Sequence, residues 1–116
     1  MLRSISAQEL REKIENHEDL IIIDTRLPRF YKESHIPHAV NMPFVFEMPG
    51  EAYTLPKDKA IVVSCYIGRS SKAFAFMLSE KGYEKVLNLT GGYTAWKKEV
   101  EGDENYTFTL TEEDEE

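Results

Sequence analysis

Residues 60–72 read AIVVSCYIGRSSK, and this segment is the most informative about the fold. The run AIVVS at 60–64 is apolar without polar alternation, which predicts a strand covered on both faces, as in a parallel sheet. A short loop follows, and a helix is predicted to begin near Ser70 or Ser71 and to end at Gly82. The predicted buried stripe of this helix consists of Ala73, Phe74, Met77 and Leu78. Residues 85–89 predict the next strand, so the segment forms a βαβ unit with a right-handed crossover.

Further elements are predicted on either side of this unit. A capping box at Ser6 and Glu9, in which each side chain can accept a backbone N–H of the other residue, predicts a helix over 6–17. The run LIIID at 20–24 predicts a second covered strand. The remaining elements are a short helix over 28–34, a brief strand over 39–42, an irregular connection over 43–56 that includes one helical turn, and a last helix that opens at Gly91-Gly92. The pattern predicts an α/β fold, with a short, mostly parallel β-sheet flanked by helices on both faces.

The net charge of -7 lies entirely at the C-terminal end of the chain. Residues 103–116 contain seven acidic residues and no Lys or Arg, so the acidic and basic residues of 1–102 balance. We therefore expect a single domain over 1–102 and an acidic tail over 103–116, in which alternating apolar and Thr residues indicate a short strand at 106–111. An acidic tail disfavours binding to nucleic acid or to an anionic membrane surface.

Composition narrows the class of protein further. The hydrophobic content is 41%, and no apolar run approaches the roughly 18 residues of a membrane span. The N-terminal residues lack the long apolar stretch of a secretory signal, so the expected location is the cytoplasm. Cys65 is the single cysteine, which excludes an intrachain disulfide and a zinc site with two thiolates. Any chemistry at Cys65 must end with an acceptor outside the chain.

Cys65 stands where a parallel α/β sheet binds ligands, directly after a covered strand. The loop and the following helix N-terminus can aim backbone N–H groups at its sulfur, and Arg69 adds a positive charge nearby. These features lower the pKa of a thiol, and the thiolate is its nucleophilic form. The alternative is a small buried cysteine without chemistry. The strand, Cys, Gly, Arg, Ser and helix in succession favour the functional interpretation.

Four motifs, in order along residues 4–100, resemble the rhodanese family of sulfurtransferases. The family's active-site loop reads C-x-x-G-x-R-S, and Cys65, Gly68 and Ser71 match it. The other three matching segments are IIDTR at 22–26, HIPHAVNMP at 35–43 and LTGGYTAW at 89–96. The chain departs from the pattern at Ser70, which occupies the loop Arg position while Arg69 lies one residue earlier, and at Ser34 and His38, which stand at Gly positions. The displaced Arg bears on how well thiosulfate, the family's usual test donor, is bound.

The resemblance implies a sulfurtransferase that works through a Cys65 persulfide. Cys65 would take a sulfane sulfur from a donor such as thiosulfate and pass it to a thiophilic acceptor, cyanide or a thiol. The implied partners are a small anionic sulfur donor and that acceptor, with a sulfur-donor protein as a further candidate. The resemblance implies no metal and no organic cofactor. The alternative from another class is a catalytically weak rhodanese-like module for binding or for carrying sulfur.

The candidate site residues come from the loop and from the end of the neighbouring strand. Cys65 is the candidate nucleophile, and the candidate substrate-binding residues are Tyr66, Ile67, Gly68, Arg69, Ser70, Ser71, Asp24 and Arg26. Asp24 is expected at the same sheet edge as Cys65, where it could instead cap the turn. Arg26 could bind an anion or pair with Asp24 or Glu33. The Gly91-Gly92 pair is expected to allow close backbone approach beneath the loop.

Phosphatase chemistry is a rival on a related fold. It needs an Arg six residues after the Cys, in the pattern C-x-x-x-x-x-R. Position 71 is Ser, and the loop is one residue short for a phosphate cradle. The sequence therefore disfavours phosphatase and phosphatase-like arsenate reductase activity.

Overall fold

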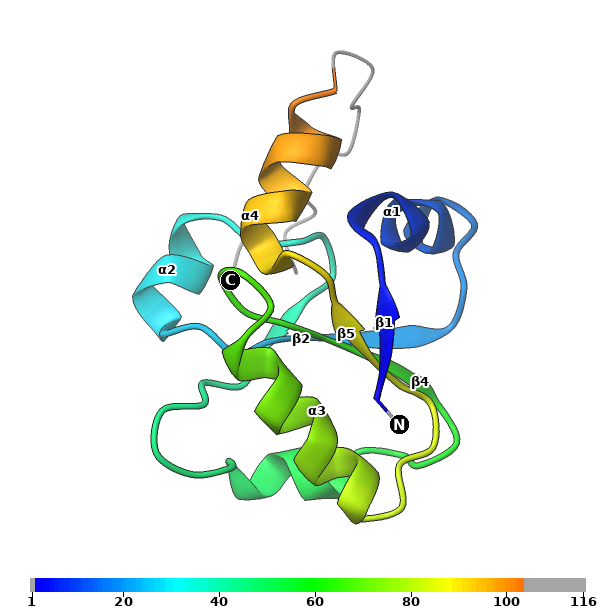
Figure 1. Ribbon diagram of the computed structural model, residues 1–116, viewed down its shortest axis with the longest axis vertical. Coiled ribbons are helices and arrows are strands. Elements are labelled where there is room, and N and C mark those ends of the chain that lie inside the picture. Colours follow the sequence, from blue (N-terminus) through cyan, green and yellow to red (C-terminus); the bar gives the residue numbers. More distant parts are fainter. Residues whose placement is uncertain (1, 104–116) are drawn as a thin grey trace.

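The computed structural model describes residues 2–103, and in this part of the chain five parallel strands form one sheet (Figure 1). The strands are β1 (Arg3–Ile5), β2 (Leu20–Asp24), β3 (Val40–Asn41), β4 (Ala60–Ser64) and β5 (Val86–Leu89). Their spatial order is β1-β5-β4-β2-β3, which places β4 at the centre. The predicted α/β fold with a parallel sheet is confirmed.

The helices agree with the predicted positions. They are α1 (Ala7–Glu15), α2 (Pro28–Glu33), a 3₁₀ helix (Gly50–Thr54), α3 (Ser70–Glu80) and α4 (Gly92–Trp96), which continues into a π-helical turn (Lys97–Glu101). The predicted capping box is present at the start of α1. The Ser6 hydroxyl accepts from the backbone N–H of Glu9 at 3.1 Å, and the Glu9 carboxylate accepts from the N–H of Ser6 at 2.9 Å.

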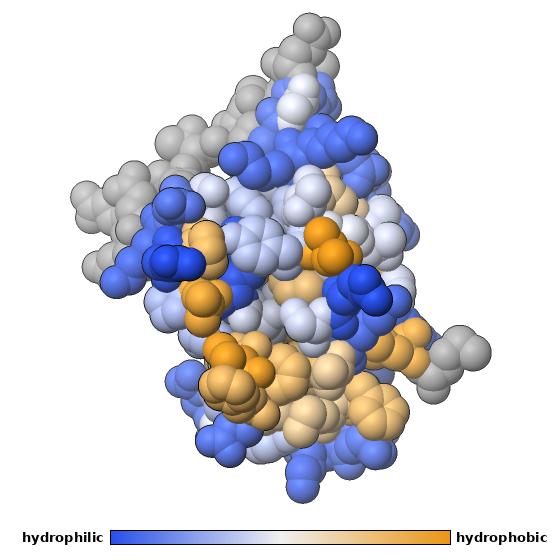
Figure 2. Space-filling model, turned by 60° about the vertical axis from the view of Figure 1, so that its left-hand side comes forward, coloured by the Kyte–Doolittle hydropathy of each residue, from blue (hydrophilic) through white to orange (hydrophobic). Residues whose placement is uncertain are grey.

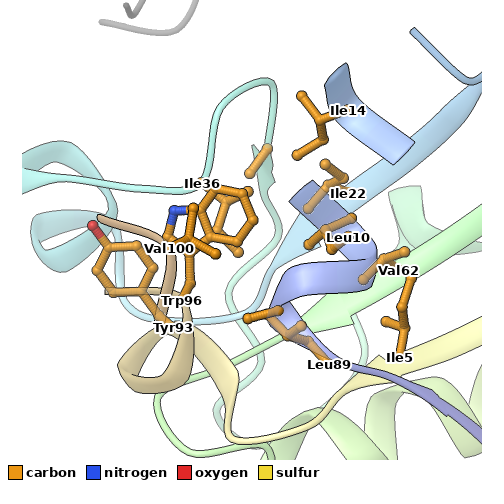
Figure 3. Packing of buried hydrophobic residues seen from close by; sticks show 12 residues of the cluster. Ile5, Leu10, Ile14, Ile22, Ile36, Val62, Leu89, Tyr93, Trp96 and Val100 are labelled. Carbon is orange, nitrogen blue, oxygen red and sulfur yellow. The ribbon is translucent and has the colours of Figure 1, made fainter. Parts of the chain in front are cut away.

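Helices cover both faces of the sheet, so each face has its own apolar core. On one face, Ile22 of β2 and Val62 of β4 pack with Leu10 of α1 and Trp96 of α4 (Figure 3). The other face is covered by α3 and the 3₁₀ helix. There the intervening strand residues Ile23, Ile61 and Val63 pack with residues such as Phe74, Leu78 and Ala52. Neighbouring residues of one strand thus face opposite cores, which explains the apolar runs without polar alternation.

Two features differ from the sequence predictions. The edge strand β1 was not predicted, because three residues carry no readable periodicity and their pairing with β5 is a long-range contact. The stripe predicted on α3 is half wrong. Phe74 and Leu78 are buried, but Ala73 and Met77 are exposed, and Ser71 and Ala75 take their place in the interior. The helix is therefore rotated so that its first turn faces Cys65.

The described residues contain no helix long and apolar enough to cross a membrane. The predicted strand at 106–111 and residues 104–116 of the predicted tail lie outside the described part of the chain. Asp103, assigned to the tail from its charge, forms an ion pair of 2.7 Å with Arg11 of α1. The domain boundary of the sequence analysis stays a prediction.

Candidate active site

The carboxyl ends of β2 and β4 lie side by side in the sheet, and they carry Asp24 and Cys65. Asp24 at the end of β2 pairs in register with Ser64 at the end of β4, and Cys65 follows directly. Thr25 strengthens this junction, since its backbone N–H and its hydroxyl both donate to the Ser64 carbonyl, at 2.8 and 3.0 Å. Asp24 and Cys65 therefore lie at the same edge of the sheet, as predicted.

The loop after β4 curls around the sulfur of Cys65. The backbone N–H of Gly68 donates to Sγ at 3.1 Å, and the N–H of Ser71, in the first turn of α3, donates at 3.4 Å. Gly68 has a φ of +85°, and a Cβ there would lie 2.9 Å from the Leu89 carbonyl oxygen, so this position requires glycine. The loop and the first turn of α3 thus aim two backbone donors at the sulfur of a residue that is only 5% exposed.

A buried polar chain connects the sulfur to β5. In the thiol form, Cys65 donates to Ser71 Oγ at 3.2 Å and the Ser71 hydroxyl donates to Asn88 Oδ1 at 2.6 Å. When the sulfur is a thiolate, the Ser71 hydroxyl can rotate and donate to Sγ. The Asn88 side-chain amide in turn donates to the Gly68 carbonyl at 3.1 Å. Asn88 therefore fixes both the hydroxyl and the backbone that contact the sulfur. Sequence reasoning missed Asn88, although a polar residue inside the apolar strand VLNL was a visible signal.

Hydrogen bonds lower the pKa of Cys65. Burial alone raises the pKa of the thiol, but the hydroxyls of Ser70 and Ser71 and the N–H groups of Ser71 and Gly68 outweigh it, so the pKa is lowered overall. The sequence predicted a contribution from the charge of Arg69. The largest lowering contributions come instead from two hydroxyls in the first turn of α3. Ser70, which stands at the family's Arg position, provides one of them.

Helix α4 donates backbone hydrogen bonds to the active-site loop. The N–H groups of Tyr93 and Thr94 donate to the carbonyls of Cys65 and Tyr66, at 2.7 and 2.9 Å. A Cβ at Gly92 would clash with the Cys65 carbonyl oxygen and would lie 2.7 Å from the Tyr66 carbonyl oxygen. The close backbone approach predicted for the glycine pair is confirmed for Gly92, whereas a Cβ at Gly91 would meet the side chain of Ala95. The start of α4 and the active-site loop therefore form one hydrogen-bonded unit.

Asp24 and Arg26 form a buried ion pair. The guanidinium of Arg26 contacts the Asp24 carboxylate at 2.7 Å, and each side chain is 3% exposed. Arg26 Nη2 also donates to the Ser34 carbonyl at 2.7 Å, and the guanidinium lies 4.1 Å from the centre of the Tyr93 ring. Of the two uses that the sequence left open for Arg26, the structure shows pairing with Asp24.

Cys65 opens into a cavity of about 310 Å³. The loop lines it with Tyr66, Ile67, Arg69 and Ser70, and the facing wall is formed by Thr25, Arg26, Leu27, Phe30, Phe44 and Val45. Exposed apolar side chains gather on this face of the molecule, as Figure 2 shows. Of the predicted binding residues, Gly68 and Ser71 hold the sulfur, and Asp24 lies outside the cavity wall. Sequence reasoning missed the apolar wall, because its residues come from separate segments.

Comparison with known proteins gives the family. The family model described as Rhodanese-like domain matches residues 6–99. The chain belongs to this family. A rhodanese-related protein from Thermoplasma volcanium has the same fold, with a TM-score of 0.75 and 28% identity over 94% of this chain and 99% of that one.

Two relatives carry names that state an activity. The chain is 33% identical over 99 residues to the Sulfurtransferase of Allochromatium vinosum, covering 84% of this chain and 91% of the relative. It is also 33% identical over 97 residues to the Thiosulfate sulfurtransferase GlpE of Coxiella burnetii, covering 84% of this chain and 89% of the relative.

One departure from the rhodanese pattern now has a structural explanation. His38, at a Gly position of the motif, has a φ of +70°, so the backbone keeps the left-handed conformation that favours glycine. Ser34, at the other Gly position, is extended, with a φ of -168° that any residue adopts.

Proposed function

We propose that this rhodanese-like chain is a sulfurtransferase that carries a sulfane sulfur on Cys65 from a donor such as thiosulfate to cyanide or a thiol. The observation that supports this most is the set of hydrogen-bond donors around the Cys65 sulfur, two of them the N–H groups of Gly68 and Ser71. Such donors stabilise an anionic sulfur, whether it is a thiolate or a persulfide. The adjoining cavity offers space for the donor and the acceptor in turn.

The loading step follows from this geometry. The Cys65 thiolate attacks the sulfane sulfur of thiosulfate, a bond forms between Sγ and that sulfur, and the sulfur–sulfur bond of thiosulfate breaks with release of sulfite. Charge is conserved, since the persulfide keeps one negative charge and sulfite leaves with two. The persulfide anion then lies among the loop donors. Arg69 lines the cavity and can interact with the leaving sulfite.

The unloading step restores the enzyme. Cyanide, or an acceptor thiolate, attacks the outer sulfur of the persulfide, and the bond between that sulfur and Sγ breaks. Cys65 leaves as a thiolate, which the same hydrogen bonds stabilise. No second cysteine is needed, which suits a chain with a single one.

A single-turnover experiment tests this proposal. The protein is mixed with excess thiosulfate, freed of small molecules and then treated with cyanide. We expect one sulfite per chain in the first step and one thiocyanate per chain in the second, and neither from Cys65→Ser. Loading without transfer to any acceptor would favour a sulfur carrier. If neither thiosulfate nor polysulfide loads Cys65, the chain is a binding module and the proposal is wrong.

A further inference from the structure

A second cavity of about 420 Å³ lies next to the Cys65 cavity. Arg26, Phe30 and Tyr66 line both cavities. The Tyr66 ring is held edge-to-face against Phe30, with 5.3 Å between the ring centres, and the Arg26 guanidinium lies 5.4 Å from the centre of the Tyr66 ring. Tyr66 therefore forms a wall shared by the two cavities, and a molecule that reaches Cys65 past this ring can extend into the second cavity.

The second cavity carries a positive charge that the described part of the chain leaves unpaired. Lys97 and Lys98 line it and are exposed, and the ammonium group of neither forms a hydrogen bond or an ion pair with any residue of 2–103. Arg26 is already neutralised by Asp24. Glu33 is the acidic residue in the lining, so the two lysines leave a net positive charge. Such a cavity attracts an anionic group.

The backbone positions of both lysines are fixed relative to the active-site loop. They follow α4, whose first residues donate hydrogen bonds to the carbonyls of Cys65 and Tyr66. The helical backbone continues without a break into the turn that holds Lys97 and Lys98. Val100 in the same turn is fully buried, which anchors this segment on the core. The two lysines are therefore carried by a backbone segment that is fixed relative to the reacting sulfur.

We propose that the second cavity binds the carboxylates of an organic thiol, the acceptor whose sulfur meets the Cys65 persulfide in the first cavity. This inference rests on the proposed function. The acceptor loses its thiol proton to solvent, and its thiolate attacks the outer sulfur of the persulfide. The bond to Sγ breaks, Cys65 leaves as a thiolate and the acceptor leaves as a persulfide, so atoms and charge balance. Lys97 and Lys98 bind the far end of the acceptor during this step.

The test compares two acceptors that differ in charge. The acceptors are glutathione, which has two carboxylates, and its diethyl ester, in which both are neutral. Steady-state transfer from thiosulfate is measured for wild type and for the double variant Lys97→Gln, Lys98→Gln. We expect the variant to raise the KM for glutathione about three- to tenfold, the range of two partly screened ion pairs, and to leave the KM for the ester unchanged. The effect on glutathione should shrink at high salt.

Two controls separate the binding site from general effects. Cyanide is too small to extend beyond Cys65, so its kcat/KM should be the same for both proteins. The double variant Lys57→Gln, Lys59→Gln removes the same charge just before β4, at the end of the strand opposite to Cys65. It should leave the kinetic constants for all three acceptors unchanged. If the double variant at Lys97 and Lys98 has an unchanged KM for glutathione, or an equal rise in the KM for the ester, this inference is wrong. Normal loading of wild type by thiosulfate would still support the proposed function in that case. A wild-type protein that takes up no sulfur would instead overturn the proposed function.

Discussion

The carboxyl ends of β2 and β4 are neighbours in the sheet, yet the groups that follow them are in opposite states. After β2, the charges of Asp24 and Arg26 neutralise each other in a buried pair. After β4, the sulfur of Cys65 receives hydrogen bonds from its own loop and opens into a cavity. The charges of the Asp24–Arg26 pair compensate each other within the structure. The hydrogen-bond donors around Cys65, in contrast, can stabilise a negative charge that a substrate brings. We therefore expect a structural role for the residues at the end of β2 and the proposed sulfur chemistry at the end of β4.

The largest effect is expected at Cys65. Cys65→Ser should reduce sulfur transfer to the uncatalysed background, because a serine hydroxyl cannot hold a sulfane sulfur as a persulfide. The hydroxyl oxygen still accepts the N–H groups of Gly68 and Ser71, so the free energy of unfolding should stay within about 1 kcal/mol of wild type. Transfer assays and urea denaturation measure the two quantities. Residual turnover above background would show that another group carries the sulfur.

Asp24 should behave in the opposite way. Asp24→Ala leaves the buried Arg26 guanidinium without its counter-charge, and we expect a loss of about 3–5 kcal/mol in the free energy of unfolding by urea denaturation. Asp24→Asn is the matched control, since it keeps hydrogen-bond acceptance by a side-chain oxygen and should lose less. A loss below about 1 kcal/mol for Asp24→Ala would mean that the charge of Arg26 is available to bind an anion.

Ser71 tests the hydrogen bonds around the sulfur. Ser71→Ala removes one of the groups that lower the pKa of Cys65, so the pKa should rise and less thiolate should be present at neutral pH. We expect sulfur loading at neutral pH to fall about tenfold, with the pH profile moved to higher pH and the rate recovered there. Ser79→Ala, on the same helix with its hydroxyl bonded to the Ala75 carbonyl, should change neither quantity. A lower rate without a shifted profile would contradict this role.

Arg69 should have the smallest effect, because it is exposed. Arg69→Ala should raise the KM for thiosulfate about threefold at low salt and less at high salt, without a change in the pH profile. Ser70→Ala should instead move the pH profile upward, since the Ser70 hydroxyl lowers the pKa of Cys65. Lys72→Ala, an exposed cation just along the chain that does not line the Cys65 cavity, is the control. Equal effects of Arg69→Ala and Lys72→Ala would show that Arg69 has no specific part in donor binding.

Local sequence patterns predicted most of the fold. The covered strands AIVVS and LIIID, the capping box at Ser6 and the glycine pair at 91–92 each reflect a local physical requirement, and the structure contains all four. The edge strand β1 could not be predicted in this way, because it exists through its pairing with β5. The rotation of α3 could not be predicted either. The sequence allows a buried stripe with Ala73 and Met77 or one with Ser71 and Ala75. The second is buried because Ser71 packs beside Cys65.

The candidate site was predicted in part. The position of Cys65 after a covered strand followed from topology. The source of its lowered pKa did not, because whether a hydroxyl or a guanidinium reaches a sulfur depends on side-chain directions that spacing does not contain. Asn88 acts through Ser71 and Gly68, from a strand 20 residues beyond Gly68 along the chain. The apolar cavity wall likewise combines residues from α2 and from the connection after β3.

The most direct test of the central claim is the intact mass of the protein after excess thiosulfate and again after cyanide. We predict a gain of one sulfur atom per chain that cyanide removes, and no gain in Cys65→Ser. Loading by polysulfide but not by thiosulfate would keep Cys65 as the sulfur carrier and change only the donor. No gain of sulfur from either donor would contradict the assignment of chemistry to this loop.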